Sequence, residues 1–167
     1  MLEKLFDRYQ IILSSGSPRR QQFLKEANIP YLLQLFPVEE IYPKELQREE
    51  ITAYLSDLKS RPFDKIINDN ELVITSDTIV WHQGKALGKP KNTKDAVCML
   101  QQLSADSHEV ITSISIKGKY FQEVVSDTTK VYFKKLSLTE ITYYIQNFNP
   151  FDKAGSYGIQ EWLGQIA

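Results

Sequence analysis

The stretch ILSSGSPRRQQF, Ile12–Phe23, predicts a strand that turns directly into a helix. Its apolar start suits a buried strand and runs into a small, hydroxyl-rich turn. Ser17 is a favourable N-cap and Pro18 suits the first helical position, so we expect a helix from there to about Asn28. Folds of the α/β class commonly bind ligands at a turn of this kind, between a strand and a helix.

Arg19 and Arg20 fall in the first turn of that helix, where the helix dipole disfavours cations. An anion bound at the turn would explain them. Free backbone N–H groups, the Ser15 and Ser17 hydroxyls and two guanidinium groups could together hold a phosphate or triphosphate. The alternative is two solvated arginines, one of them paired with a surface carboxylate. The turn is not a P-loop, because the G-x-x-x-x-G-K-[ST] pattern is absent.

Apolar periodicity along the rest of the chain predicts interleaved strands and helices, which is a mixed α/β pattern. A second strand is expected at 29–37. After a polar loop and a helix, the pattern predicts a strand with a turn at Gln83–Gly84 and a short return strand. Strong alternation over 108–136, with a turn around Gly118, predicts long antiparallel strands.

Three further helices are expected. The first is amphipathic and places Lys59 at the edge of its buried stripe. Thr93 is the expected N-cap of the second, and Ser137 and Glu140 have the S-x-x-E spacing of a capping box at the start of the third. The expected spans are 46–61, 93–103 and 138–148.

Composition limits the classes of function. The 167 residues carry a net charge of -1, so a broad surface for nucleic acid is not expected. The single cysteine, Cys98, cannot form an intrachain disulfide, which suits a reducing cytosol. No apolar run approaches the roughly 20 residues of a membrane span, and the first ten residues are too charged for a signal peptide. We therefore expect a cytoplasmic protein without a nucleic-acid or membrane partner.

Asp77 interrupts the apolar run LVITSDTIVW, which is typical of an interior strand. An ionised carboxylate there is costly unless a cation, a metal or hydrogen-bond donors compensate it. Asp77 is therefore either a structural residue held by backbone amides or a functional one. Glu39 and Glu40, after the second expected strand, could bring further carboxylates close, although exposed glutamate pairs are common.

The segment DKAGSYGIQ, 152–160, is a candidate binding loop. Its glycines permit close approach of a ligand to the backbone, Lys153 could meet a phosphate, and Gln160 could meet a base edge. The alternative is an ordinary tight turn. Lys89 alone would be a surface lysine. His82 and His108 lack the spacing of metal ligands.

Five motifs, LSSGSPRR, SDTIV, LGKPKN, HEVITS and DKAGSYGIQ, occur in this order between Ile12 and Gln160. Together they resemble the Maf family of nucleoside triphosphate pyrophosphatases. The resemblance implies an α/β fold with a mixed, partly antiparallel twisted sheet flanked by helices, and a nucleotide-binding cleft like that of inosine triphosphate pyrophosphatase. It also implies a cytoplasmic enzyme, assisted by Mg²⁺ or Mn²⁺, that cleaves a nucleoside triphosphate to a monophosphate and pyrophosphate.

The resemblance assigns roles to individual residues. Asp77 matches the catalytic acid that accepts a proton from the attacking water. Thr78 after that aspartate resembles the branch that acts on dTTP and UTP. The base-selecting positions are Arg19, Thr78 and Gln160. The phosphate-binding positions are Ser15, Arg20, Lys59, Lys89 and Lys153. The expected metal ligands are Glu39, Glu40 and Asp77.

The sequence departs from the family pattern in a few places: Ser14, Ala105, Ser113 and Asn149. We expect a single Maf-like domain over 1–167. Family members continue for about 25 residues beyond the equivalent of Ala167, enough for a further strand and helix. A homodimer is left open. The alternative functions are a non-catalytic nucleotide-binding or interaction module, and a pyrophosphatase for modified purine nucleotides.

Overall fold

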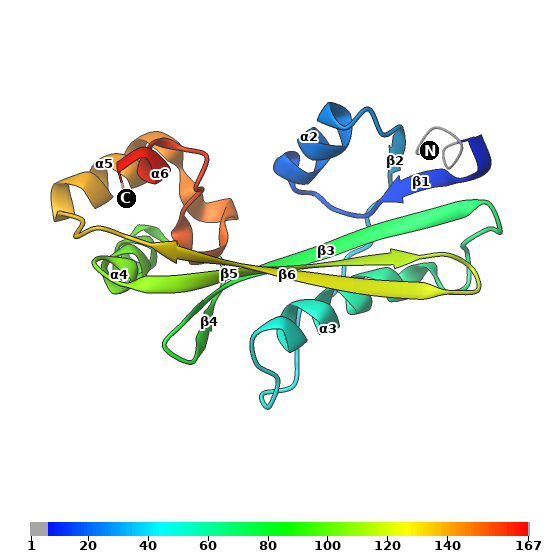
Figure 1. Cartoon of the computed structure of the whole chain (residues 1–167), viewed down its shortest axis with the longest axis horizontal. Helices are drawn as coiled ribbons and strands as arrows, with labels where there is room; N and C mark the ends of the chain where they lie inside the picture. Colours follow the sequence, from blue (N-terminus) through cyan, green and yellow to red (C-terminus); the bar gives the residue numbers. More distant parts are fainter. Residues whose placement is uncertain (1–6, 167) are drawn as a thin grey trace. The chain divides into compact units, whose positions relative to one another are not determined.

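The computed structural model describes residues 7–166. Within this range the chain forms two compact units (Figure 1). The first comprises residues 7–77 and 112–127, and the second residues 78–111 and 128–166. The prediction of a single domain over 1–167 includes residues outside the described range and stays a prediction.

A six-stranded sheet has the order β2-β1-β3-β5-β6, with β4 paired to β3. β1 pairs in parallel with both β2 and β3, whereas β3 and β4 are antiparallel. The predicted mixed, partly antiparallel sheet is therefore confirmed. The strands are β1 Gln10–Leu13, β2 Tyr31–Leu33, β3 Glu71–His82, β4 Lys85–Leu87, β5 Ser107–Lys117 and β6 Gln122–Tyr132.

The second strand is much shorter than the expected 29–37. β2 pairs only with β1, and the pairing runs from Ile11 opposite Tyr31 to Leu13 opposite Leu33. Beyond Leu13 the chain turns toward its helix, so no strand remains for the rest of the segment to pair with. As an edge strand, β2 leaves Leu33 about half exposed, at 49%.

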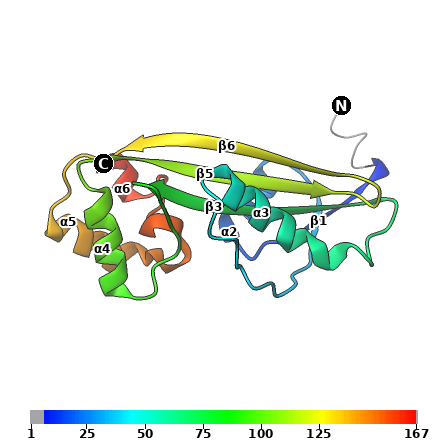
Figure 2. The ribbon, with the colours of Figure 1, turned by 90° about the horizontal axis from the view of Figure 1, so that it is seen from below.

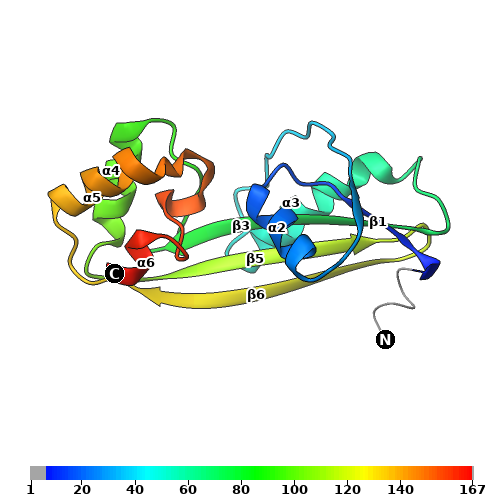
Figure 3. The same cartoon turned by 90° about the horizontal axis from the view of Figure 1, so that it is seen from above.

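Two helices flank the strands of the first unit on opposite faces, as the views in Figures 1, 2 and 3 agree. α2 spans Pro18–Glu26 and α3 spans Glu49–Ser60, followed by a 3₁₀ turn at Arg61–Phe63. Both helices lie inside the expected ranges. Ser17 is the N-cap of α2 by position, but its side chain makes no capping hydrogen bond.

Small hydroxyl residues make hydrogen bonds between α3 and the sheet. Thr52 Oγ1 and Ser113 Oγ are 2.6 Å apart, and Thr75 Oγ1 donates to the Ser56 carbonyl at 2.6 Å. All four residues have no exposed surface. We call these four residues the hydroxyl seam. Because hydrogen bonds are directional, the seam fixes the position of α3 more narrowly than apolar packing alone would.

The second unit contains α4 Thr93–Leu103, α5 Leu138–Phe148 and the short α6 Trp162–Ile166. The capping box of Ser137 and Glu140 is present as predicted. The predicted cap of α4 is wrong by one residue, because Asn92 Oδ1, and not Thr93, accepts a hydrogen bond from Asp95 N at 2.9 Å. Asparagine is at least as good an N-cap as threonine, so both positions fit the local pattern.

The core of the second unit joins α4, α5 and the loop that precedes α6. Buried leucines of α4 pack against Ile141 and Tyr144 of α5. His108 belongs to the same interior: it is 2% exposed, its Nε2 lies 2.6 Å from Tyr157 Oη, and its ring meets Phe133 edge to face. Among residues 7–166, no helix is both long and apolar enough to cross a bilayer.

Candidate functional site

The turn after β1 holds Ser15 and Arg20 together. Ser15 Oγ accepts hydrogen bonds from Ser17 N and from an Arg20 guanidinium nitrogen, each at 3.3 Å. The same Arg20 nitrogen donates to the Ser76 carbonyl at 2.8 Å. Arg20 is thus fixed between the turn and β3, while Arg19, beside it in the first turn of α2, is half-buried.

Lys59 joins two carboxylates in the first unit. Its Nζ lies 2.6 Å from Asp77 Oδ1 and 3.2 Å from Glu40 Oε1. Lys59 is the penultimate residue of α3, and Asp77 belongs to β3. The Asp77 side chain is only 9% exposed, so the predicted buried carboxylate is compensated by a lysine and not by backbone amides alone.

Burial raises the pKa of Asp77 above its usual value, while the ammonium of Lys59 and the guanidinium of Arg20 oppose that shift. Burial also lowers the pKa of Arg20, against the attraction of Asp77. A carboxylate whose pKa is raised is a better proton acceptor than a solvated one. Asp77 therefore has the environment expected of a general base.

The expected metal ligands are only partly brought together. Asp77 and Glu40 contact one cation, Lys59, although the Glu40 side chain is 49% exposed, and Glu39 is exposed as well. In residues 7–166, no three His, Cys, Asp or Glu side chains form a group that could hold a metal ion. The predicted three-carboxylate set is therefore not assembled in the described chain. Two carboxylates still fit Mg²⁺, which commonly takes one or two from the protein and completes its shell with water and substrate phosphates.

Thr78 follows Asp77 directly in β3, and successive side chains of a strand point to opposite faces. Thr75 and Asp77 both contact α3, through Ser56 and Lys59. Thr78 therefore follows the alternation of β3 and is half-buried in the second unit.

The loop before α6 is held by its own polar contacts. Lys153 Nζ, in a side chain only 8% exposed, pairs with Asp152 at 3.0 Å and with Glu161 at 3.1 Å. Tyr144 Oη donates to the second oxygen of Glu161 and accepts from Gly158 N. The predicted phosphate ligand Lys153 is thus already neutralised by two carboxylates, so a phosphate would compete with them.

The remaining predicted residues of the second unit differ in their exposure. Lys89 and Gln160 are exposed. Gly155 has a φ of 65°, donates to the Gly88 carbonyl at 3.0 Å, and would place a Cβ 2.6 Å from Val80. Only glycine fits at this position, so the backbone next to Lys89 and the loop are locked together.

Sequence reasoning missed Tyr144 and Glu161. Tyr144 follows the apolar period of α5, and nothing in that pattern separates a tyrosine that orders a loop from one that fills the core. Glu161 directly follows the last motif, and its partner lies eight residues back. Its position beside a lysine-containing loop was the only local signal.

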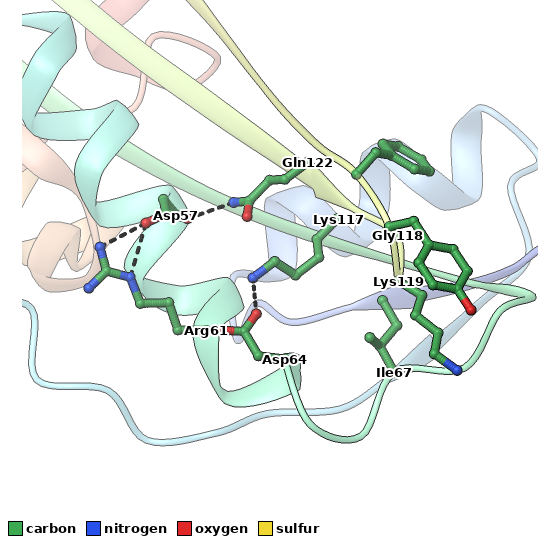
Figure 4. Close-up of a pocket in the computed structure, with 10 residues that line it drawn as sticks. Asp57, Arg61, Asp64, Ile67, Lys117, Gly118, Lys119 and Gln122 are labelled. Carbon is green, nitrogen blue, oxygen red and sulfur yellow. Dashed lines mark hydrogen bonds and ion pairs between the residues drawn. The ribbon is translucent and has the colours of Figure 1, made fainter.

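A cavity of about 440 Å³ in the first unit contains none of the predicted site residues (Figure 4). Its charged groups are already paired: Lys117 contacts Asp64, and Arg61 makes two hydrogen bonds to Asp57. Gln122 also donates to Asp57, at 2.7 Å. None of the residues that line this cavity is a predicted phosphate ligand, so the cavity is distinct from the predicted triphosphate site.

Comparison with known proteins adds to this geometry. The sequence model of a family described as Maf-like protein matches residues 10–167. A protein of Flavobacterium johnsoniae named dTTP/UTP pyrophosphatase is 53% identical over 167 residues, which are all of this chain and 86% of that protein. A protein of Flavobacterium psychrophilum with the same name is 55% identical over 166 residues, which are 99% of this chain and 85% of that protein.

Among solved structures, the Ham1 protein of Staphylococcus aureus is similar with a TM-score of 0.50 at 18% identity. The match covers 74% of this chain and 71% of that protein. At this identity the similarity concerns the fold alone. It agrees with the mixed sheet flanked by helices.

Proposed function

Because the chain belongs to the Maf family, we propose that it hydrolyses nucleoside triphosphates, dTTP and UTP foremost, to the monophosphate and pyrophosphate. The observation that carries the proposal is the buried Asp77 carboxylate, held at 2.6 Å from Lys59. The substrate follows the names of relatives that are 53% and 55% identical over almost the whole chain.

Three side chains of the first unit, those of Asp77, Arg20 and Glu40, have roles in this reaction. Asp77 accepts the proton of the attacking water, because burial raises its pKa. Arg20, held by Ser15 and the Ser76 carbonyl, binds phosphate oxygens through its guanidinium group. A divalent ion held by Asp77 and Glu40 would neutralise charge on the phosphate oxygens.

Pyrophosphate release tests the proposal directly. We expect the full chain to release pyrophosphate from dTTP and UTP in the presence of Mg²⁺ or Mn²⁺, with a nucleoside monophosphate as the other product. Product analysis by ion-exchange chromatography would show both. Binding of these nucleotides without release above background would favour the non-catalytic alternative.

Base selection is tested by changing the two predicted residues of the second unit. We expect dTTP and UTP to exceed CTP, ATP and 7-methyl-GTP in kcat/KM, because hydrogen-bond donors that meet pyrimidine carbonyl oxygens are mismatched with an amino group. Thr78→Gln and Gln160→Glu should alter that order more than they alter the melting temperature. Lys94→Gln, at an exposed position of α4, is the control.

The outcome is read from the full substrate panel for each variant. Equal kcat/KM across the panel, or a preference for 7-methyl-GTP, would overturn the base assignment and leave the hydrolysis itself standing. An unchanged order in Thr78→Gln would show that Thr78 has no part in base selection.

A further inference from the structure

The ammonium of Lys59 lies where two carboxylates converge. It contacts Asp77 at 2.6 Å and Glu40 at 3.2 Å, so both oxygens point toward one positive charge. Oxygens arranged around a single centre are also what a divalent cation requires, at the shorter distance of roughly 2.0–2.6 Å. A metal ion that used both oxygens would therefore lie close to the position taken by the Lys59 ammonium.

The two cations exclude each other. A divalent ion that contacted both oxygens would lie beside the present position of the ammonium, where like charges repel. Solvent screens this repulsion little on the side of the buried Asp77 and more on the side of Glu40, whose side chain is 49% exposed. Lys59 is able to leave. It lies in the last turn of α3, its side chain is 17% exposed, and four flexible methylene groups carry the charge.

We propose that Lys59 is an internal counter-ion that a divalent metal must displace from Asp77 and Glu40. This inference rests on the proposed function for the identity of the metal. Displacement weakens binding of the metal alone. A nucleotide polyphosphate offers new oxygens to the displaced ammonium, so metal and nucleotide strengthen each other's binding.

The test measures Mn²⁺ binding without nucleotide, from the electron paramagnetic resonance signal of free Mn²⁺ in a titration of the full chain. Lys59→Met removes the competing charge and leaves the two carboxylates in place, so we expect the Kd for Mn²⁺ to fall by about tenfold, a change equal to about 1.4 kcal/mol. Lys59→Gln, which keeps a hydrogen-bond donor, should act in the same direction. Lys65→Met removes an exposed positive charge from the same unit and should leave the Kd nearly unchanged.

A double variant locates the effect. In an Asp77→Asn background, Lys59→Met should no longer tighten Mn²⁺ binding, because one of the two converging carboxylates is gone. An equal or larger Kd in both Lys59 variants, at unchanged circular dichroism, would overturn the displacement. Since no nucleotide is present, this result is independent of pyrophosphate release, and either proposal can fail while the other stands.

Discussion

Asp77→Asn should lower turnover by roughly 100-fold or more, the usual contribution of a general base, while nucleotide binding survives. Asparagine keeps the shape of the side chain, and its carbonyl oxygen can still accept from Lys59, which now lies 2.6 Å from Asp77. It cannot accept a proton from water. The expected result is a loss in kcat with little change in nucleotide Kd, measured by pyrophosphate release and by isothermal titration calorimetry.

Asp127→Asn is the matched control, because Asp127 is an exposed aspartate of the same unit. It removes the same charge and should leave kcat unchanged. Near-normal turnover in Asp77→Asn would make Asp77 a structural residue. Glu39 or Glu40 would then be the better candidate for the base, and Glu40 is the one in contact with Lys59.

Acid should destabilise the protein through His108. Burial lowers its pKa to about 4 from 6.5, and the charge of His82 acts in the same direction while Asp106 opposes it. The unfolded chain therefore binds a proton on His108 between pH 6.5 and about 4, whereas the folded chain does not. The contribution of His108 to the free energy of unfolding is fully present above the unfolded pKa of 6.5. It falls by about 3 kcal/mol as the pH drops to the folded pKa of about 4.

The measurement compares wild type with His108→Phe in urea unfolding from pH 7 to pH 4. Phenylalanine loses the 2.6 Å contact with Tyr157 at every pH. The free energies of unfolding of the variant and the wild type therefore differ by a constant offset, and in addition by a difference in slope against pH. Only the slope reports the titration. A difference in unfolding free energy that stays constant over this range would show that His108 is not protonated on unfolding.

Local signals in the sequence predicted local structure well. The capping box of Ser137 and Glu140 starts α5 at the expected residue because both partners lie within one helical turn. The predicted length of β2 was wrong. The strand ends where its partner β1 ends, at Leu13, and the apolar residues that follow Leu33 do not extend it. Pairing between strands is a non-local property that alternation alone does not contain.

In the candidate site too, local features were predictable from the sequence and contacts between distant residues were not. The position of Lys59 at the edge of the buried stripe of α3 followed from helical periodicity, but its partner Asp77 is 18 residues away on β3. No spacing rule connects the two. Likewise, burial of Lys153 against Asp152 and Glu161 could not be predicted, because a charged residue in a glycine-containing loop is usually solvated.

The hydroxyl seam affects how Lys59 on α3 lines up with Asp77 on β3. A helix packed only through leucine and isoleucine can shift by one turn, about 5.4 Å, and find similar grooves. Such a shift of α3 in one direction would carry Leu55 to the place of Lys59 and leave Asp77 facing a hydrocarbon. In that shift Arg48 would take the place of Thr52, so the bond between the Thr52 and Ser113 hydroxyls would be lost. The Thr52–Ser113 bond thus helps to fix the register of α3, and substitutions that remove these two hydroxyls should make the placement of Lys59 less defined before they unfold the protein.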